Sequence, residues 1–303
     1  MNVLSLFDGM SCGRIALDRA GISVTSYHAS ELDKYAIQVT QANWPDTVQL
    51  GDVTKWREWD IDWAGIDLLI GGSPCQGFSF AGKQLAFDDP RSRLFFVYVD
   101  ILNHIKSLNP DVKFMLENVR MKKEYLAIIS EQLGVKPVCI NSALVSAQNR
   151  QRFYWVNWIS SHPLDKGVLL GSIIESGYVD NSKSYCIDAS YGKGGNLEQY
   201  FKKSRRQLVF EYDRKNGIGA PLTKSIPILA SDWRGLNRNQ KQNAVLSSDM
   251  TYRKLTPIEC ERLQTVPDNY TNHASNTQRY KMLGNGWTVD VIAHIFRSMD
   301  NKS

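Results

Sequence analysis

The stretch GGSPCQGFSFAG at residues 71–82 decides the fold, because it follows the apolar run IDLLI at residues 66–70. A short apolar run bounded by glycine is typical of a parallel strand that is buried on both faces. Cys75 directly follows Pro74, whose fixed φ stiffens the turn. Open α/β sheets bind ligands at the carboxyl ends of such strands, so we predict a functional site there. The alternative, a buried structural cysteine, is disfavoured because the glycine and serine neighbours offer little apolar surface.

Length and composition indicate a globular protein with room for two domains. The chain has 303 residues, of which 43% are hydrophobic and 22% charged. No apolar run is long enough to span a bilayer, and the N-terminus lacks the basic segment of a signal peptide, so we expect a cytoplasmic protein. The five cysteines are widely spaced and form no CxxC pair, which favours reduced thiols over disulfides or a metal site.

The N-terminal part alternates strands with helices. Strands are predicted at residues 3–7, 24–30 and 48–50, and the first helix is predicted at residues 14–20. The turn after the first strand has the spacing Gly-x-x-x-Gly, which is not the dinucleotide fingerprint. Glu31 and Asp52 follow the next two strands, in position for ribose hydroxyls and for an adenine amino group. Either acid alone could be a surface or capping residue, but three such units together favour an adenosine site.

A further predicted strand, at residues 113–116, ends in Glu117 and Asn118. A carboxyl group beside an amide can recognise the N–H and amino edge of a heterocycle. The alternative is that Asn118 caps a helix at residues 124–133. Strands are also expected at 138–141 and 153–158. Arg150 and Arg152 precede the last of these and would point the same way on a strand, which suits phosphates or a carbonyl oxygen; a plain exposed edge would look similar.

From residue 159 to residue 252 the alternation stops and basic clusters appear. This segment holds 13 Lys and Arg against 9 Asp and Glu, and so most of the net charge of +5. We read it as a second, irregular domain, either a polyanion-binding module or a solvated basic face. Residues 253–303 contain a capping box at Thr256, a turn over residues 280–287 and an apolar helix at 289–299 that returns to the sheet.

Taken together, these motifs resemble the DNA (cytosine-5)-methyltransferase family, mainly its bacterial and phage type, with details similar to the animal de novo enzymes. The resemblance covers nearly the whole chain outside residues 159–252. It implies an α/β fold, a Rossmann-like methyltransferase sheet with helices on both faces, plus a smaller β-rich target-recognition domain. The motifs that carry it are LSLFDGMSCG (4–13), Glu31, GDV (51–53), GGSPCQGFSFAG (71–82), ENV (117–119), QNRQR (148–152), RKLTPIECERLQTVPDNY (253–270) and LGNGW (283–287).

The resemblance implies a catalytic role for four residues. Cys75 matches the family's nucleophile, which adds to C6 of cytosine because C5 alone is a poor nucleophile. Glu117 matches the acid at cytosine N3, and Arg152 matches the side chain at O2 with Arg150 beside it. Because C6 cannot be reached inside a duplex, the base must be flipped out, and residues 77–93 are the expected lid. Expected DNA contacts are Gln76, Ser79, Lys83, Arg91, Arg93, Arg205, Arg206, Arg234, Asn237 and Arg238.

The methyl donor implied by the resemblance is S-adenosylmethionine, with S-adenosylhomocysteine as product and no metal. Two places depart from the common bacterial pattern. Ser11 and Cys12 stand where many relatives have glycine, and Gly286 and Trp287 stand where a serine and a β-branched residue are usual. The expected cofactor residues are Phe7, Asp8, Gly9, Met10, Cys12, Glu31, Leu32, Asp52, Val53, Ser73, Pro74, Asn285, Gly286 and Trp287.

Three functions remain open at the level of the sequence. The first is a sequence-specific methylase of duplex DNA from a restriction–modification system or a phage, acting as a monomer in the cytoplasm of a bacterial or phage-infected cell. The second is a tRNA cytosine-5 methylase built on the same motifs. The third is a catalytically silent DNA-binding homologue, which the intact motifs disfavour. The basic segment favours duplex DNA.

Overall fold

A computed structural model describes residues 1–73, 93–211 and 252–299 of the chain. Nine of the predicted site residues therefore lie outside the described residues. They are Pro74, Cys75, Gln76, Ser79, Lys83, Arg91, Arg234, Asn237 and Arg238.

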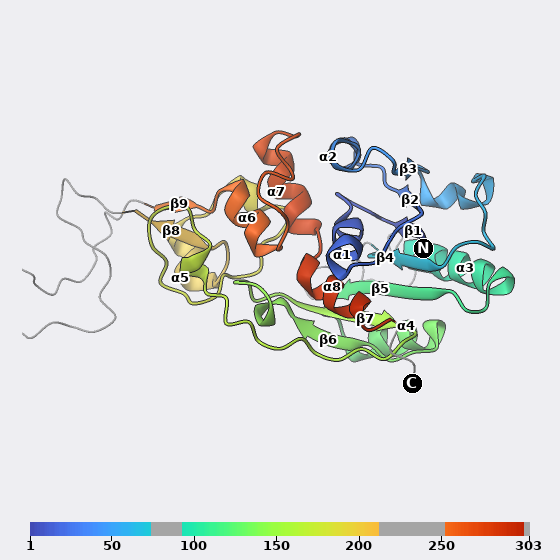
Figure 1. Cartoon of the computed structure of the whole chain (residues 1–303). Helices are drawn as coiled ribbons and strands as arrows, with labels where there is room; N and C mark the ends of the chain where they lie inside the picture. The colour runs from blue at the N-terminus through green and yellow to red at the C-terminus, as the bar shows by residue number, and fades with distance from the viewer. Residues whose placement is uncertain (74–92, 212–251, 300–303) are drawn as a thin grey trace, which may run out of the picture.

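The centre of the fold is a seven-stranded sheet with the order β3-β2-β1-β4-β5-β7-β6 (Figure 1). All neighbouring strands run parallel except β7, which is antiparallel to both β5 and β6. This confirms the predicted α/β class with a Rossmann-like sheet. The strands are β1 (Asn2–Leu6), β2 (Ser26–Ser30), β3 (Val48–Gln49), β4 (Leu68–Gly71), β5 (Lys113–Val119), β6 (Val138–Asn141) and β7 (Gln151–Val156).

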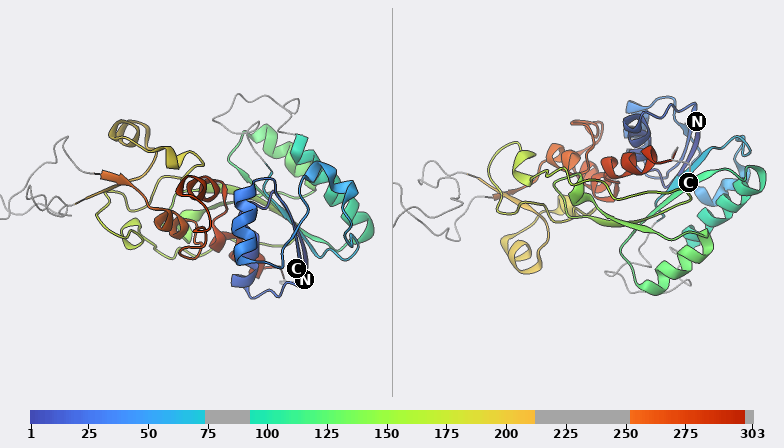
Figure 2. Two further views of the ribbon diagram at one scale, coloured as in Figure 1. Left: turned by 90° about the horizontal axis from the view of Figure 1, so that it is seen from above. Right: turned by 60° about the horizontal axis from the view of Figure 1, so that its bottom comes forward.

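Both faces of the sheet are apolar, as expected for buried parallel strands. Successive residues alternate between two cores: Leu68 and Ile70 pack on one face and Leu69 on the other. Figure 2 shows the helices that cover each face. One face carries α1 (Cys12–Ala20), α2 (Lys34–Asn43) and α8 (Val289–Arg297), and the other carries the 3₁₀ helix η1 (Val53–Glu58), α3 (Arg93–Leu108) and α4 (Lys123–Leu133).

Three α-helices of the described residues were not expected from the sequence: α2, the short helix α5 (Leu197–Lys203) and α7 (Asn276–Asn285). Helix α2 has a mixed sequence of modest helix propensity, so its stability comes from the cap at Asp33 and from the burial of Val39 in the core. Residues 280–287, predicted as a turn, are helical as far as Asn285, within α7 (Asn276–Asn285). Strand β5 also runs on through Val119, beyond the predicted end, so Asn118 does not cap α4, whose N-cap is Lys122.

Strands β8 and β9 and helix α5 lie at the smaller end of the molecule, at the left of Figure 1. Strands β8 and β9 pair antiparallel, and Tyr178, Tyr200, Leu208 and Phe210 make a small separate core. The capping box predicted at Thr256 is present at the start of α6. The bounds are η2 (Ser142–Leu144), η3 (Leu170–Ser172), η4 (Tyr191–Lys193), α5 (Leu197–Lys203), β8 (Leu208–Phe210), β9 (Tyr252–Lys254) and α6 (Pro257–Leu263). The domain limits at 158 and 252 remain predictions.

Within the three described ranges, no helix is both long enough and apolar enough to cross a membrane.

The end of α7 packs against the backbone at Asp188, which explains a glycine inside a helix. A Cβ atom at Gly284 would lie 2.2 Å from the carbonyl carbon of Asp188 and 2.4 Å from the amide nitrogen of Ala189.

We predict that Gly284→Ala lowers the free energy of unfolding by about 1–3 kcal/mol, because backbone atoms must move. Urea denaturation of both proteins measures this difference. The control is Gly171→Ala, where the nearest atom is 4.0 Å away; an equal loss there would refute the packing argument.

Candidate active site

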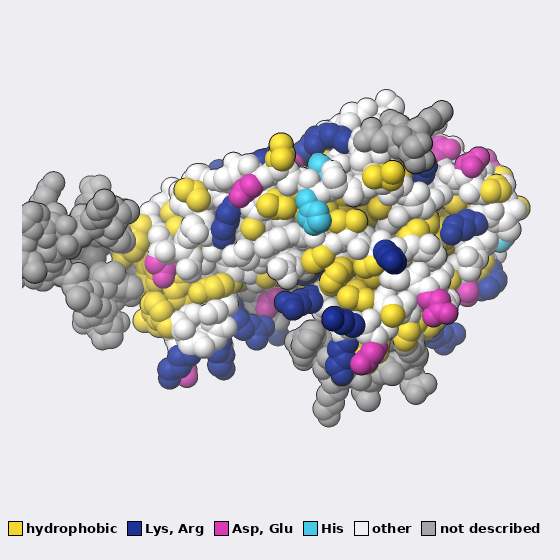
Figure 3. All heavy atoms as spheres, turned by 90° about the horizontal axis from the view of Figure 1, so that it is seen from below, with side chains coloured by type: hydrophobic (Ala, Val, Ile, Leu, Met, Phe, Trp, Pro, Cys, Tyr) yellow, Lys and Arg dark blue, Asp and Glu magenta, His cyan; other side chains and the backbone are white. Residues whose placement is uncertain are grey.

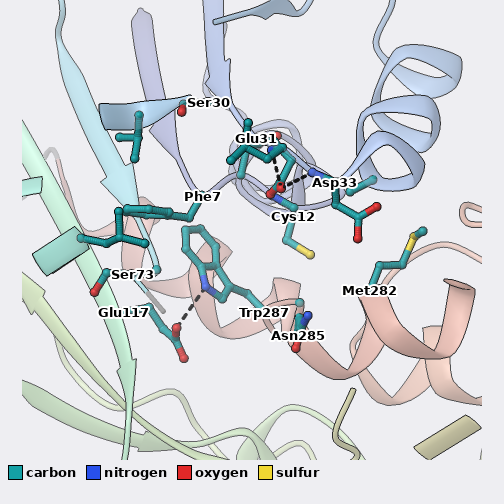
Figure 4. Close-up of a pocket in the computed structure, with 18 of the residues that line it drawn as sticks. Phe7, Cys12, Ser30, Glu31, Asp33, Ser73, Glu117, Met282, Asn285 and Trp287 are labelled. Atoms are coloured by element: carbon teal, nitrogen blue, oxygen red, sulfur yellow. Dashed lines mark hydrogen bonds between the residues drawn. The ribbon is translucent and has the colours of Figure 1, made fainter. Parts of the chain in front are cut away.

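The carboxyl ends of the parallel strands open into a cavity of about 510 Å³ (Figure 4). Its walls come mainly from the loops after β1, β2, β3 and β4, from the end of β5, from the start of β7 and from the end of α7. The cavity brings together fifteen of the predicted site residues: Phe7, Asp8, Gly9, Cys12, Glu31, Leu32, Asp52, Val53, Ser73, Glu117, Arg150, Arg152, Asn285, Gly286 and Trp287.

The turn between β1 and α1 is braced from inside by Asp8. Its carboxylate accepts hydrogen bonds from Ser5 Oγ at 2.6 Å, from Tyr27 Oη at 2.8 Å and from the Ser11 hydroxyl. Burial raises the pKa of Asp8 from 3.8 to about 6, although these donors oppose the rise. Met10 is 1% exposed in the core and does not line the cavity. Met10 therefore supports the turn from the core, whereas Asp8 both holds the turn together and lines the cavity.

Glu31 is held by three backbone N–H groups. Oε2 accepts from Gly9 at 2.7 Å, and Oε1 accepts from Leu32 at 2.7 Å and from Asp33 at 2.8 Å. These bonds tie the tip of β2 to the first turn and fix the direction of the carboxylate. Because a carboxylate oxygen can accept more than one hydrogen bond, Glu31 keeps acceptor capacity toward the cavity.

Asp52 lies at the tip of β3 and begins the 3₁₀ helix η1. Its Oδ1 accepts from the Thr54 amide at 2.9 Å and from Thr54 Oγ1 at 2.8 Å. The backbone hydrogen bond from Thr54, followed by that from its hydroxyl, lowers the pKa of Asp52. The carboxylate of Asp52 is thus ionised at neutral pH and can accept a hydrogen bond from an amino group, as the predicted contact requires.

The opposite wall holds a carboxylate between two donors. Arg152 Nε lies 3.0 Å from Glu117 Oε1, and Trp287 Nε1 lies 3.2 Å from Glu117 Oε2. The antiparallel pairing of β7 with β5, which places Arg152 opposite Val119, makes the first contact possible. The dashed line between Trp287 and Glu117 in Figure 4 marks the second.

Arg150 is buried, and its guanidinium binds two parts of the chain at once. Its Nη2 donates to the carbonyls of Gly286 at 2.9 Å and Gly284 at 3.2 Å. Its Nη1 donates to the Ile187 carbonyl at 3.1 Å and lies 3.2 Å from Cys186 Sγ. In this arrangement the guanidinium fixes the turn at the end of α7.

The described residues predicted to contact DNA lie away from the cavity lining. Arg93 starts α3 and is exposed. Arg205 is exposed and forms an ion pair with Asp188 at 3.2 Å, while Arg206 donates to the Gly194 carbonyl. Figure 3 shows Lys and Arg side chains at the smaller end of the molecule, where α5 ends in Lys202 and Lys203.

Several lining residues were not among the predicted site residues. Asp33 and Lys281 form an ion pair of 2.6 Å across the rim although they are 248 positions apart. No local sequence signal marks such a pair, and Lys281 lies in the unexpected helix α7. The further lining residues are Ser30, Ala36, Gly51, Gly72, Leu94, Val119, Met282 and Gly284, together with Asn118, which the sequence placed beside Glu117.

The comparisons with known proteins agree with this geometry. The family model described as C-5 cytosine-specific DNA methylase matches residues 1–301. The chain is 31% identical to the type II methyltransferase M1.ScrFI of Lactococcus lactis subsp. cremoris, over 98% of this chain and 77% of the relative. It is 27% identical to the orphan methyltransferase M.SPRI of Bacillus phage SPR, over 99% and 97% of the two chains. The solved structure of the Entamoeba histolytica methyltransferase EhMeth shares the fold, with a TM-score of 0.71 at 18% identity over 100% and 99% of the chains.

Asp8 gives a testable pH dependence. The pKa of Asp8 is about 6 in the folded protein, above the ordinary value of 3.8. At pH values between these two, the folded protein binds more protons than the unfolded chain. The free energy of unfolding therefore falls as the pH rises through that range. We therefore predict that Asp8→Asn gains up to about 3 kcal/mol relative to wild type between pH 4 and pH 7. Urea denaturation at several pH values measures this.

The control for Asp8 is Asp290, which should show the opposite sign. Burial raises its pKa, but hydrogen bonds from Lys166 and Arg19 outweigh burial and hold the pKa below its usual value. The stabilisation of the fold by ionised Asp290 is therefore fully present at pH values above the usual pKa of an aspartate and is lost as the pH falls. Asp290→Asn should lose stability relative to wild type as the pH rises, and the same sign for both variants would contradict the assignment.

Proposed function

Because the chain belongs to the C-5 cytosine-specific DNA methylase family, and is therefore an S-adenosylmethionine-dependent DNA (cytosine-5)-methyltransferase, we propose that it methylates cytosine within one short sequence of duplex DNA. One observation carries the proposal. A single cavity joins the carboxylates Glu31 and Asp52 at one end to the pair Glu117 and Arg152 at the other. A methyl donor and an extruded base can therefore meet in it.

The first end of the cavity fits the adenosyl group of S-adenosylmethionine. Glu31 and Asp52 offer acceptors for ribose hydroxyls and for an amino group, and Phe7 and Val53 offer apolar surface beside them. Leu32 is 70% exposed although it lines the cavity. A large exposed apolar side chain in a cavity wall is a natural place for a flat ring to lie. When bound, S-adenosylmethionine supplies the methyl group to C5 and leaves as S-adenosylhomocysteine.

The second end carries the chemistry on the base. The thiolate of Cys75, which lies outside the described residues, adds to C6, and the electrons of the C5–C6 double bond move to C5. Glu117 shares a proton with N3 as the adduct forms, and Arg152 binds O2. After methylation a base takes the C5 proton, the double bond forms again and the thiolate leaves. The cytosine must be flipped out of the duplex to reach these groups.

Residues 159–252 are proposed to read the target sequence, with the exposed basic side chains around α5 on the phosphates and other Arg and Asn residues of the segment on bases. The enzyme is proposed to act as a monomer in the cytoplasm of a bacterial or phage-infected cell. The relatives from Lactococcus lactis and from Bacillus phage SPR support that setting.

The first test is bisulfite sequencing of a mixed-sequence plasmid after incubation with the protein and S-adenosylmethionine. We expect protected cytosines within one short repeated context. Protection without any context would contradict the recognition role of residues 159–252. If total tRNA is methylated and the plasmid is not, the substrate is RNA and not duplex DNA. If neither is methylated, the catalytic proposal is refuted.

The second test concerns Cys75. We predict that Cys75→Ser loses at least about a thousandfold in turnover yet still binds DNA, because the serine hydroxyl is a far weaker nucleophile. Duplex DNA with 5-fluorocytosine at the target should give a covalent complex with wild type that survives denaturation, since fluorine cannot leave as a cation, and none with the variant. The control is Cys139→Ser, because Cys139 is exposed on β6 and does not line the cavity. This variant should keep the turnover of the wild type. Full activity of Cys75→Ser would remove it as the nucleophile.

A further inference from the structure

We propose that Trp287 is a positioning residue that holds one oxygen of Glu117, so that the other oxygen is the one that meets cytosine N3. This inference rests on the proposed function and assigns a role to the indole beyond closing the cofactor site. It follows from three features of the described residues: where the indole lies, how its backbone is held, and what binds each carboxylate oxygen.

The indole extends from the turn after α7 into the cavity, with its ring beside Phe7 and its nitrogen toward Glu117, as Figure 4 shows. Its Nε1 points at Glu117 Oε2 over 3.2 Å. Gly72 makes room for it, because a Cβ atom there would lie 3.0 Å from Trp287 Nε1 and 3.1 Å from Glu117 Oε2. The ring therefore fits a slot that larger residues at Gly72 would close.

The backbone that carries the indole is fixed from several directions. The carbonyl of Gly286 accepts from Arg150 Nη2 at 2.9 Å and from Gln264 Nε2 at 3.2 Å. The amide of Gly286 donates to the Met282 carbonyl at 2.8 Å. On the other side, Thr288 Oγ1 donates to Gln264 Oε1 at 2.8 Å. A side chain that extends from so constrained a turn can orient its partner.

The two oxygens of Glu117 have different partners. Oε1 lies 3.0 Å from Arg152 Nε, and Oε2 accepts from Trp287. The terminal torsion of a glutamate is broad, so an unheld carboxylate would turn freely about it. When Arg152 binds the O2 atom of an entering cytosine, Oε1 becomes available to N3, while the indole N–H keeps Oε2 in place. The indole thus selects the oxygen that takes part in the proton transfer.

The test removes the indole N–H but keeps an aromatic ring. We expect Trp287→Phe to lower kcat on the duplex substrate about tenfold, the loss of one hydrogen bond to a charged group, while KM for that DNA changes less than about twofold. The control is Trp158→Phe, since Trp158 Nε1 donates to the Ile295 carbonyl at 3.1 Å outside the cavity lining. It should leave kcat near the wild-type value.

A double-mutant cycle decides whether Trp287 acts through Glu117. Single-turnover rates with tritiated S-adenosylmethionine are compared for Trp287→Phe, Glu117→Ala and the double variant. We expect the tenfold effect of Trp287→Phe to shrink below about twofold when Glu117 is absent. An equal loss in both backgrounds, or an unchanged kcat in the single variant, overturns the inference alone. A wild-type protein that methylates neither DNA nor tRNA overturns the proposed function and this inference with it.

Discussion

The parallel pairing of β1 with β2 and β4 is the constraint on which the rest of the structure depends. Leu6 at the end of β1 pairs with Ser30 on one side and with Gly71 on the other. All three strands therefore stop at one edge, and the residues that follow them, Phe7, Glu31 and Gly72, meet there. Since both faces of the sheet are buried under helices, this edge is where the strand ends can present polar groups to a ligand.

A second constraint comes from the antiparallel strand β7. It enters the sheet between β5 and β6, so that its first residues reach the edge at which β5 ends. Arg152 thereby comes within 3.0 Å of Glu117, and Arg150 continues past the edge to the carbonyls at the end of α7. A parallel β7 would have brought the two arginines to the opposite edge. The reversal of one strand thus completes the site.

The cavity is closed by parts of the chain that are far apart in sequence. Helix α7 brings Lys281 to Asp33 across the rim and ends in the turn that presents Trp287 to Glu117. The same helix end packs against the backbone at Asp188, which belongs to the segment proposed to read DNA. One segment therefore touches the proposed cofactor end, the proposed base end and the segment proposed to read DNA.

The sequence by itself determined the strands and the order of the polar groups at their tips. Short apolar runs predicted β1, β4 and β5, and Glu31, Asp52 and Glu117 were each placed next to a strand end, because these signals are local. The tertiary structure alone decided the rest: the helix α7, the ion pair of Arg152 with Glu117 and the indole on its other oxygen. Local patterns cannot contain such contacts, since Glu117 and Trp287 are 170 positions apart and meet only when the chain folds back on the sheet edge.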